Sequence, residues 1–399
     1  MKPRHLILAL TLSLVGLLPG CSSERATVAP PTSFDAYREA TRDLVAATRS
    51  FQSADQAAEI GYNTPQEWRP AIQPAGMKAE RGILLVHGLG DSPFSFSDVG
   101  PRLARQGFLV RSLLLPGHGT DPAHLIDVSA DDWRRVVAEQ TTLLKRDAGA
   151  VYLGGFSTGA NLVTALALAD PDIDGLLLFS PGFRSDEGYE WMAPLLAPFV
   201  TWLREPDVAR PQQNPVRYLN VPTNGFGQFH RTSSEIRNAL DAQPFDRPAT
   251  IILAENDSVL DVKEIAATFA QRFTHPDSRL IWYGSNPLLD DDRILVRPDY
   301  LPEYRISQFS HMSVLFSPGN PLYGRDGSLR FCQNGQNPDF HARCMRGEEV
   351  WFSDWGFEMP DRVHARLTFN PYFDWQMQVA GAVLGAEGPR PLNDQAATP

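Results

Sequence analysis

The stretch VYLGGFSTGANLVTALAL, residues 151–168, decides the fold of this chain. Its apolar start is typical of a strand buried on both faces, and residues 160–168 are typical of a helix. Between them, residues 155–159 match G-x-S-x-G, a pattern that places a serine on a strained turn from strand to helix. Glycine at both ends of the pattern avoids collisions with the strand and the helix. Ser157 is therefore the candidate nucleophile, and the alternative is a serine in a tight turn without a chemical role.

Similar strands and helices alternate on both sides of this turn. Strands are expected at residues 83–86, 108–114, 151–153, 176–179, 251–253 and 280–283, and helices at 34–51, 97–106, 129–145, 160–168 and 374–384. Ser129 can cap the helix that follows it, with Asp132 in the first turn. This alternation predicts an α/β fold with a doubly wound, mostly parallel sheet.

The other segments divide the chain around this core. Residues 184–247 form an apolar, aromatic-rich insertion between core strands, which is typical of a lid over an active site. Residues 284–306 form a long excursion that must return the chain to the site. We expect a signal peptide (1–20), a lipidated cysteine and tether (21–33), a helix and irregular lead-in (34–80), a core in two halves (81–183 and 248–318), a cap (184–247), a cysteine-containing irregular extension (319–360) and a terminal helix with a polar tail (361–399).

The first twenty residues have the layout of a secretory signal peptide, with a basic start and an apolar run too short for a comfortable membrane span. Cys21 directly follows a small residue, which resembles the bacterial lipobox and implies diacylglycerol on its thiol. The polar segment 22–31 suits a tether, and several acyl chains hold an enzyme stably at a bilayer. Ser22 indicates an exported envelope lipoprotein of the outer membrane, facing the periplasm, if the host has one. The alternative is an ordinary signal peptide whose cleavage region contains a cysteine.

The charge of the chain disfavours nucleic acid as a partner. Without Lys2 and Arg4, the 36 basic residues become 34 against 47 acidic ones, which makes a formal charge of −13. An acidic surface repels both nucleic acid and anionic lipid. The composition leaves the oligomeric state open.

Cys332 and Cys344 are the cysteines that remain besides Cys21. In an oxidising compartment such a pair predicts one disulfide that closes a short loop. The alternatives are two buried thiols, or a zinc site with His341 that lacks an evident fourth ligand.

A glycine-rich loop, Val86-His87-Gly88-Leu89-Gly90, follows the first core strand. Acyl transfer needs two backbone N–H groups that converge on the carbonyl oxygen as it becomes an oxyanion. The expected donors are the amides of Leu89 and of Thr158, the residue after the nucleophile. We expect His87 to order this loop through hydrogen bonds rather than to take part in catalysis.

A serine hydroxyl becomes a good nucleophile when an imidazole takes its proton and a carboxylate fixes the tautomer of that imidazole. In this fold the acid and then the histidine follow the serine along the chain. Glu255, Asp257 and Asp261 all follow the apolar run at 251–254. Asp261 has the position of a helix cap, and Glu255 follows the strand too closely to turn toward the site. Asp257 is therefore the predicted acid.

The histidines that follow this acid are His275, His311, His341 and His364. The first lies in the connection before the next strand, the third inside the cysteine loop, and the last has no evident strand before it. His311, in the order Ser-His-Met-Ser, is the predicted base. The long segment 284–306 separates it from the strand at 280–283.

On these residues the chain resembles the α/β-hydrolase superfamily, and more closely its branch of bacterial carboxylesterases, monoacylglycerol lipases and lysophospholipases. The resemblance covers residues 80–318 and the last helix. Its matching pieces are LVHGLG at 85–90, LPGHGT at 115–120, the turn at 155–159, Asn256-Asp257 and Ser310-His311. It implies an α/β-hydrolase fold with an inserted lid, a serine esterase without a cofactor, and Ser157, Asp257 and His311 as its triad. The segments 284–306 and 319–360 depart from the family pattern.

The leading hypothesis is hydrolysis of a small-molecule carboxylic ester through an acyl-Ser157 intermediate. Apolar residues of the segment 184–247 favour a lipid-like or aromatic acyl group, although they could equally form a small core of the cap. The same triad serves thioester, amide or peptide cleavage and acyl transfer. An alternative of another class is a non-catalytic envelope lipoprotein that binds apolar ligands. Neither a metal nor a cofactor is expected.

Overall fold

A computed structural model describes residues 31–73, 76–186, 188, 190–204, 212–285, 287 and 289–386. The predicted signal peptide, Cys21 and nearly all of the tether lie outside the described residues, as does the polar tail from residue 387. Within the described ranges, no helix is both long and apolar enough to cross a membrane.

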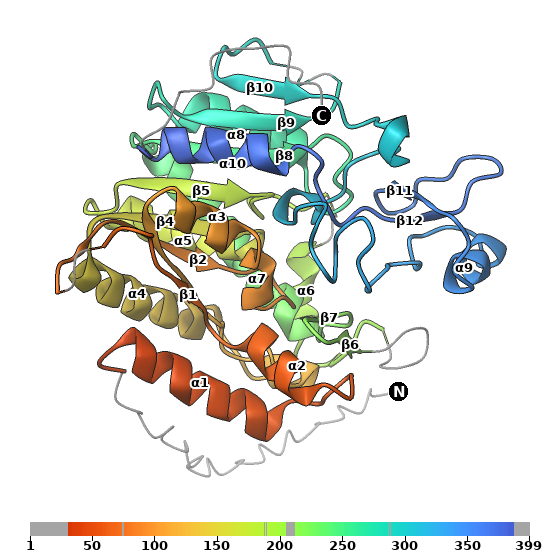
Figure 1. Cartoon of the computed structure of the whole chain (residues 1–399), viewed down its shortest axis with the longest axis horizontal. Coiled ribbons are helices and arrows are strands. Elements are labelled where there is room, and N and C mark those ends of the chain that lie inside the picture. The colour runs from red at the N-terminus through yellow and green to blue at the C-terminus, as the bar shows by residue number, and fades with distance from the viewer. Residues whose placement is uncertain are drawn as a thin grey trace, which may run out of the picture. The chain divides into compact units, whose positions relative to one another are not determined.

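A sheet of eight strands forms the centre of the fold (Figure 1). Its order is β1-β3-β2-β4-β5-β8-β9-β10, and every neighbouring pair is parallel except β1 with β3. The strands are β1 (Glu67–Trp68), β2 (Ala79–Val86), β3 (Phe108–Ser112), β4 (Ala148–Phe156), β5 (Gly175–Phe179), β8 (Ala249–Ala254), β9 (Arg279–Tyr283) and β10 (Ile294–Arg297). The predicted α/β fold with a mostly parallel sheet is confirmed.

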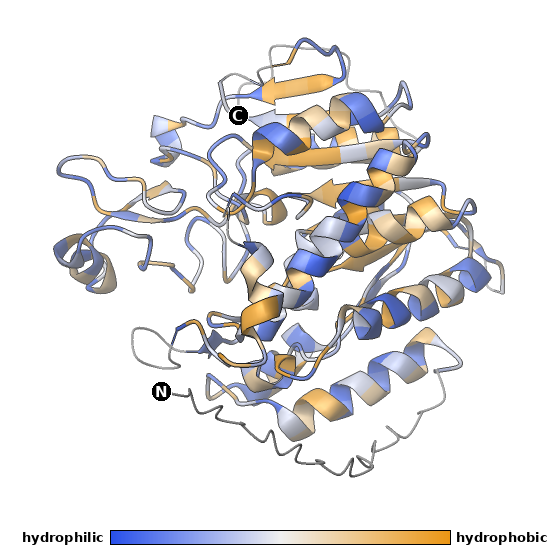
Figure 2. Ribbon diagram, turned by 180° about the vertical axis from the view of Figure 1, so that it is seen from behind, coloured by the Kyte–Doolittle hydropathy of each residue, from blue (hydrophilic) through white to orange (hydrophobic). Residues whose placement is uncertain are grey.

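Helices cover both faces of this sheet. One face packs against α4 (Ala130–Asp147), α5 (Thr158–Ala169), α7 (Thr223–Ala242) and α8 (Val262–Arg272). The other packs against α3 (Val99–Arg105), α10 (Phe373–Val383) and much of the C-terminal extension. In β2, Ile83 and Leu85 face this second layer, whereas Leu84 and Val86 face the first. Because both faces of the central strands are buried, most of their residues are apolar, and much of the sheet is orange in Figure 2.

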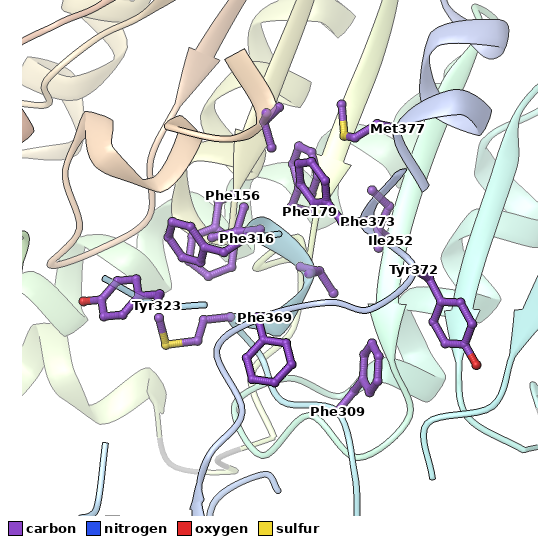
Figure 3. Close-up of a cluster of buried hydrophobic side chains, with 14 of the residues drawn as sticks. Phe156, Phe179, Ile252, Phe309, Phe316, Tyr323, Phe369, Tyr372, Phe373 and Met377 are labelled. Carbon is purple, nitrogen blue, oxygen red and sulfur yellow. The ribbon is translucent and has the colours of Figure 1, made fainter. Parts of the chain in front are cut away.

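The second core is rich in aromatic side chains. Phe156 and Phe179, from the ends of β4 and β5, pack there with Phe373 and Met377 of α10 (Figure 3). Phe309 and residues of the extension complete the cluster. The hydrophobic core therefore reaches from the sheet into the segments that depart from the family pattern.

The predicted N-terminal helix is present as α1 (Phe34–Thr48). Phe34 and Val45 are buried, and the Tyr37 hydroxyl donates a hydrogen bond to the Leu114 carbonyl, while Leu44 is exposed to solvent. The predicted cap of α4 is confirmed as a reciprocal capping box between Ser129 and Asp132. Short helices that connect the core elements include α2 (Gln56–Asn63), η1 (Pro93–Phe96), η2 (Pro122–Leu125), η4 (Pro302–Tyr304) and η5 (Ser313–Leu315).

The inserted segment 184–247 begins with an aromatic-rich run, of which the structure describes residues 190–203. The aromatic-rich run holds only η3 (Glu190–Met192) and α6 (Ala193–Leu196), because Pro198 lacks the N–H that would continue the helix. A short hairpin, β6 (Gln213–Asn214) and β7 (Arg217–Tyr218), follows. The 20-residue helix α7 was not predicted; it packs on α5 and α6 and so joins the insertion to the core.

The two segments that depart from the family pattern also carry structure. The excursion 284–306 contains β10, which extends the sheet beside β9. The extension holds α9 (Pro338–Met345) and β11 (Trp351–Ser353), which pairs in parallel with β12 (His364–Arg366). In Figure 1 the arrow of β5 points toward the side on which β7, β11 and β12 lie. The hairpin of β6 and β7 and the pair of β11 and β12 therefore lie toward the carboxyl ends of the strands, whereas β10 lies at the edge of the sheet.

Candidate active site

Ser157 occupies the turn between β4 and α5, with backbone angles of φ 53° and ψ −115°. A side chain at position 155 would place its Cβ 2.5 Å from the Ala160 amide nitrogen, and one at Gly159 would run into the Val86 carbonyl. Both glycines are therefore required by the close approach of strand and helix. The strained turn predicted for Ser157 is confirmed, and the Ser157 amide donates a hydrogen bond of 3.1 Å to the Phe179 carbonyl at the end of β5.

Asp257 and His311 are paired directly. The distance from His311 Nδ1 to Asp257 Oδ2 is 2.7 Å, and the Asp257 side chain is fully buried. The other carboxylate oxygen of Asp257 accepts hydrogen bonds from the backbone amides of Val259 and Leu260, at 2.9 and 3.2 Å. Because both oxygens are engaged, the carboxylate has one orientation toward the imidazole.

His311 is held at the carboxyl ends of β4 and β5. The Ser180 hydroxyl, just beyond β5, donates a hydrogen bond of 3.0 Å to the His311 carbonyl. The ring centroids of His311 and Phe156 lie 4.9 Å apart. Since Phe156 immediately precedes Ser157, the structure brings the imidazole to the strand end that carries the serine.

The other candidate acids and bases have different surroundings. Asp261 caps α8 through the Glu264 amide, as predicted, and Glu255 accepts from the Ser285 amide. His364 is buried on β12 beside the Ser307 hydroxyl, and burial lowers the pKa of its imidazole. The ring of His275 accepts a hydrogen bond from the amide two residues further on. Within the described ranges, Asp257 pairs with His311 and with none of the other three histidines.

The glycine-rich loop after β2 approaches the serine closely. A Cβ on Gly88 would lie 3.2 Å from Ser157 Cβ, and Gly90 has a φ of 78°. Leu89 lies between these two glycines. Thr158 is the first residue of α5, where backbone amides have no acceptor inside the helix. Both expected oxyanion donors thus border the serine.

His87 has the structural role that the sequence predicts. Its Nε2 accepts a hydrogen bond of 3.0 Å from the Leu115 amide. Complete burial, and then the neighbouring His118, lower the pKa of His87 far below its usual range. The ring is therefore a neutral acceptor that ties the loop after β2 to the end of β3.

An ion pair between Asp91 and Arg217 was not predicted. Arg217 Nε lies 3.3 Å from Asp91 Oδ1, and Arg217 Nη1 donates to the Met312 sulfur at 3.4 Å. Burial raises the pKa of Asp91, while Arg217 and His311 act in the opposite direction. The pair borders a cavity of about 10 Å³, room for about one water molecule, that Phe156 also lines. Asp91 follows the glycine loop directly, but no sequence pattern marks Arg217.

The hairpin that carries Arg217 is fixed to the core. The Tyr218 amide donates to the Gly90 carbonyl at 2.6 Å. Arg49, in a buried ion pair with Glu59, donates to the carbonyls of Asn214 and Pro215. This part of the predicted cap is therefore built into the wall of the site.

Two buried carboxylates that were not predicted lie near the acid loop. Asp299, from the excursion, accepts a hydrogen bond of 2.8 Å from Asn256, the residue before Asp257. Asp354, from the extension, is buried close enough to Asp257 for that carboxylate to raise the Asp354 pKa. Because both come from segments outside the family pattern, the sequence offers no signal for them.

Cys332 and Cys344 form the predicted disulfide, with their Cα atoms 5.5 Å apart. This bond excludes the zinc site with His341, because neither sulfur is free to bind a metal. Among the residues that the structure describes, no group of three or more His, Cys, Asp or Glu side chains is placed to hold a metal ion.

The chain is similar to several known proteins. The profile of a family described as "Serine aminopeptidase, S33" matches residues 77–285. A thermostable monoacylglycerol lipase from Bacillus sp. (strain H-257) is 28% identical over 185 residues, which are 45% of this chain and 71% of the relative. Among solved structures, a metagenome-derived lipolytic enzyme is 20% identical with a TM-score of 0.46, over 55% of this chain and 86% of the other. A monoglyceride lipase from Saccharomyces cerevisiae is 17% identical with a TM-score of 0.44, over 55% and 81%.

Proposed function

The chain belongs to the serine aminopeptidase S33 family and has the α/β-hydrolase fold, and from this premise we propose that it hydrolyses a carboxylic ester through an acyl-enzyme on Ser157. The observation that carries the proposal is the 2.7 Å pair of His311 and Asp257 beside the strained turn of Ser157. A strained serine, an oriented imidazole and a buried carboxylate together are the requirements of nucleophilic acyl transfer.

In this proposal His311 takes the proton of the Ser157 hydroxyl as the oxygen attacks the ester carbonyl carbon. The negative charge that develops on the carbonyl oxygen is stabilised by the amides of Leu89 and Thr158. The C–O bond to the alcohol then breaks, and the imidazolium gives its proton to the leaving oxygen. A water molecule repeats the sequence on the acyl-enzyme, with His311 again as base, and releases the carboxylic acid and free Ser157.

Asp257 contributes orientation and charge. Its hydrogen bond to His311 Nδ1 leaves the other ring nitrogen to exchange a proton with the serine. The buried carboxylate also stabilises the imidazolium that forms in each half of the reaction.

The surroundings of the site support an apolar acyl group. Several large apolar side chains of η3, α6 and the residues after them are exposed rather than packed into a core of the cap: Trp191, Met192, Leu195, Phe199, Val200 and Leu203. The relative described as a monoacylglycerol lipase supports the same class of substrate. The cavity beside Arg217 has room for about one water molecule, which is too little for an acyl chain.

The description of the family favours a second candidate, the hydrolysis of an amide or peptide bond, since "Serine aminopeptidase" names that activity. The same residues would perform it, with an amine in place of the alcohol as leaving group. Matched ester, thioester and amide substrates with one acyl group separate these possibilities.

The test compares the purified chain with its Ser157→Ala variant on p-nitrophenyl esters of short and long acyl chains. Ser328→Ala, at an exposed serine, is the matched control. We expect ester hydrolysis and labelling by a fluorophosphonate probe in the wild type and the control, and neither in Ser157→Ala. Equal rates in all three proteins would remove Ser157 from the mechanism, and a wild type that neither turns over esters nor labels would favour a non-catalytic binding protein.

We also propose that acyl chains on Cys21 anchor the enzyme to the outer membrane, facing the periplasm. The support is the sequence around Cys21 and the polar tether after it. Labelled palmitate should be incorporated by the wild type in its host and not by Cys21→Ser. Labelling of both proteins alike would contradict the anchor.

A further inference from the structure

Asp299, at the end of the excursion, is hydrogen-bonded to the acid loop, residues 255–261 after β8. In the sheet β9 lies between β8 and β10, and Asn256 and Asp299 each lie two residues beyond the carboxyl end of their strand. The Asn256 side-chain amide donates a hydrogen bond of 2.8 Å to Asp299 Oδ2. This bond connects the end of β8 with the end of β10, and on the β8 side it reaches the residue directly before Asp257.

The chain after Asp299 is paired with the segment that leads to the base. The Leu301 amide donates to the Ile306 carbonyl at 2.9 Å, and the Ile306 amide donates to the Leu301 carbonyl at 3.0 Å. Both side chains are buried in the second core. Residues 301–306 therefore form a fixed turn, and His311 follows it by five residues.

Beyond this turn the C-terminal extension holds the base loop, residues 307–312. The Ser307 amide donates to the Phe352 carbonyl at 2.8 Å, and the Ser310 hydroxyl donates to the Leu367 carbonyl at 2.6 Å. These bonds fix the base loop against the extension. The bond between Asn256 and Asp299, in contrast, fixes the turn before the base loop against the acid loop.

The Asp299 carboxylate is a buried acceptor. Its residue is 9% exposed, and burial is the largest cause that raises the pKa of its carboxyl group. The hydrogen bond from Asn256 is the largest of the effects that lower this pKa, and the Phe309 amide in the base loop also lowers it. Because a buried carboxylate without donors destabilises the folded protein, these contacts favour one fixed position of the side chain.

We propose that Asp299 is a positioning residue that holds the acid loop and the base loop at the separation that the hydrogen bond between Asp257 and His311 requires, an inference that rests on the proposed function. The distance of 2.7 Å between His311 Nδ1 and Asp257 Oδ2 leaves little room for a shift of either loop. A displacement of about 1 Å in a catalytic group can cost about a hundredfold in rate. Because Asp299 acts on the triad rather than on a group of the substrate, its loss should lower kcat and leave KM nearly unchanged.

The experiment measures kcat and KM for a p-nitrophenyl ester in the full-length wild type, Asp299→Ala, Asn256→Ala and the double variant. Either single substitution removes the same hydrogen bond. We therefore expect kcat to fall about five- to twentyfold in each, with KM within about twofold of the wild type. The double variant should be about as slow as the slower single variant, because the two side chains act as one unit.

Two further variants separate position from charge and from general destabilisation. Asp299→Asn keeps an oxygen that accepts from Asn256, so its kcat should lie between those of Asp299→Ala and the wild type. Asp291→Ala is the matched control, since Asp291 belongs to the same excursion and pairs with Arg293 at 2.7 Å but precedes the amino end of β10. The control should lose stability and keep the wild-type kcat.

Each outcome decides the proposal. Wild-type kcat in the folded single variants, losses that multiply in the double variant, a loss confined to KM, or Asp299→Asn as slow as Asp299→Ala overturns it, while wild-type hydrolysis leaves the proposed function intact. A wild type without hydrolysis overturns both. If Asp299→Ala does not fold, Asn256→Ala decides, because Asn256 is only half-buried and its loss removes the same bond.

Discussion

Arg217 on β7 and Asp91 after the glycine loop form an ion pair of 3.3 Å that joins the inserted hairpin to the loop expected to supply an oxyanion donor. The Asp91 side chain is almost fully buried, whereas the Arg217 side chain is 23% exposed. The pair therefore connects a segment outside the core sheet to the site itself.

Removal of Arg217 alone should lower the stability of the folded protein more than removal of both charges of the pair. Arg217→Met leaves the Asp91 carboxylate buried without its cation, and we expect a loss of about 2–4 kcal/mol in the free energy of unfolding. In the double variant Asp91→Leu/Arg217→Met, no buried charge remains, so most of this loss should be recovered. Urea denaturation of the wild type, the two single variants and the double variant measures the loss of stability and its recovery. A double variant as unstable as Arg217→Met would contradict the interpretation.

Asp257→Asn should abolish most of the catalysis and preserve the fold. The amide cannot stabilise an imidazolium and favours the wrong tautomer of His311, so kcat/KM for an ester should fall about 10³- to 10⁴-fold. Circular dichroism and the melting temperature monitor folding. Asp261→Asn, at the cap of α8, is the control: it should lower stability slightly and leave the rate within a few-fold of the wild type. Similar rates for Asp257→Asn and the wild type would exclude Asp257 as the acid.

Gly155→Ala should destabilise the turn that carries Ser157. The new Cβ would lie 2.5 Å from the Ala160 amide nitrogen, and we expect a loss of about 2 kcal/mol or more together with reduced activity. Gly61→Ala is the matched control, since a Cβ at this position in α2 has no atom within 4 Å. That variant should be neutral or slightly more stable. Equal stability of the two variants would show that the strand and helix do not approach as closely as described.

The burial of Asp354 predicts a pH-dependent cost in stability. Its pKa is raised to about 6 in the folded protein, above the usual value of an unfolded aspartate, so folding favours the proton on this group. The proton on Asp354 stabilises the folded protein fully in acid, and this stabilisation is lost as the pH rises through about 6. Asp354→Asn should therefore be more stable than the wild type at pH 7 to 8, by about 1–3 kcal/mol, and nearly equal to it near pH 4. Urea denaturation across this range tests the difference, which Asp339→Asn, at an exposed carboxylate of the extension, should not show.

Many elements of the core follow from local sequence. Strands β2, β4 and β8 are apolar runs bounded by glycine or polar residues, and the caps at Ser129 and Asp261 are patterns of four residues. Chain order, together with the position of each candidate relative to the strands, the helix cap and the cysteine loop, selected the acid and base that the structure pairs. Helix α7 was missed because its glycines and polar residues weaken the apolar periodicity.

By itself the sequence determined the parts of this protein whose interactions span a few residues: the turn at Ser157, the helix caps and the alternation of buried strands with helices. The tertiary structure decided which distant charges meet, as in the pair of Arg217 with Asp91. The physical reason is that a turn or a cap is selected by neighbouring backbone and side chains. A buried charge, in contrast, takes its partner and its proton affinity from whatever segments the folded core brings against it.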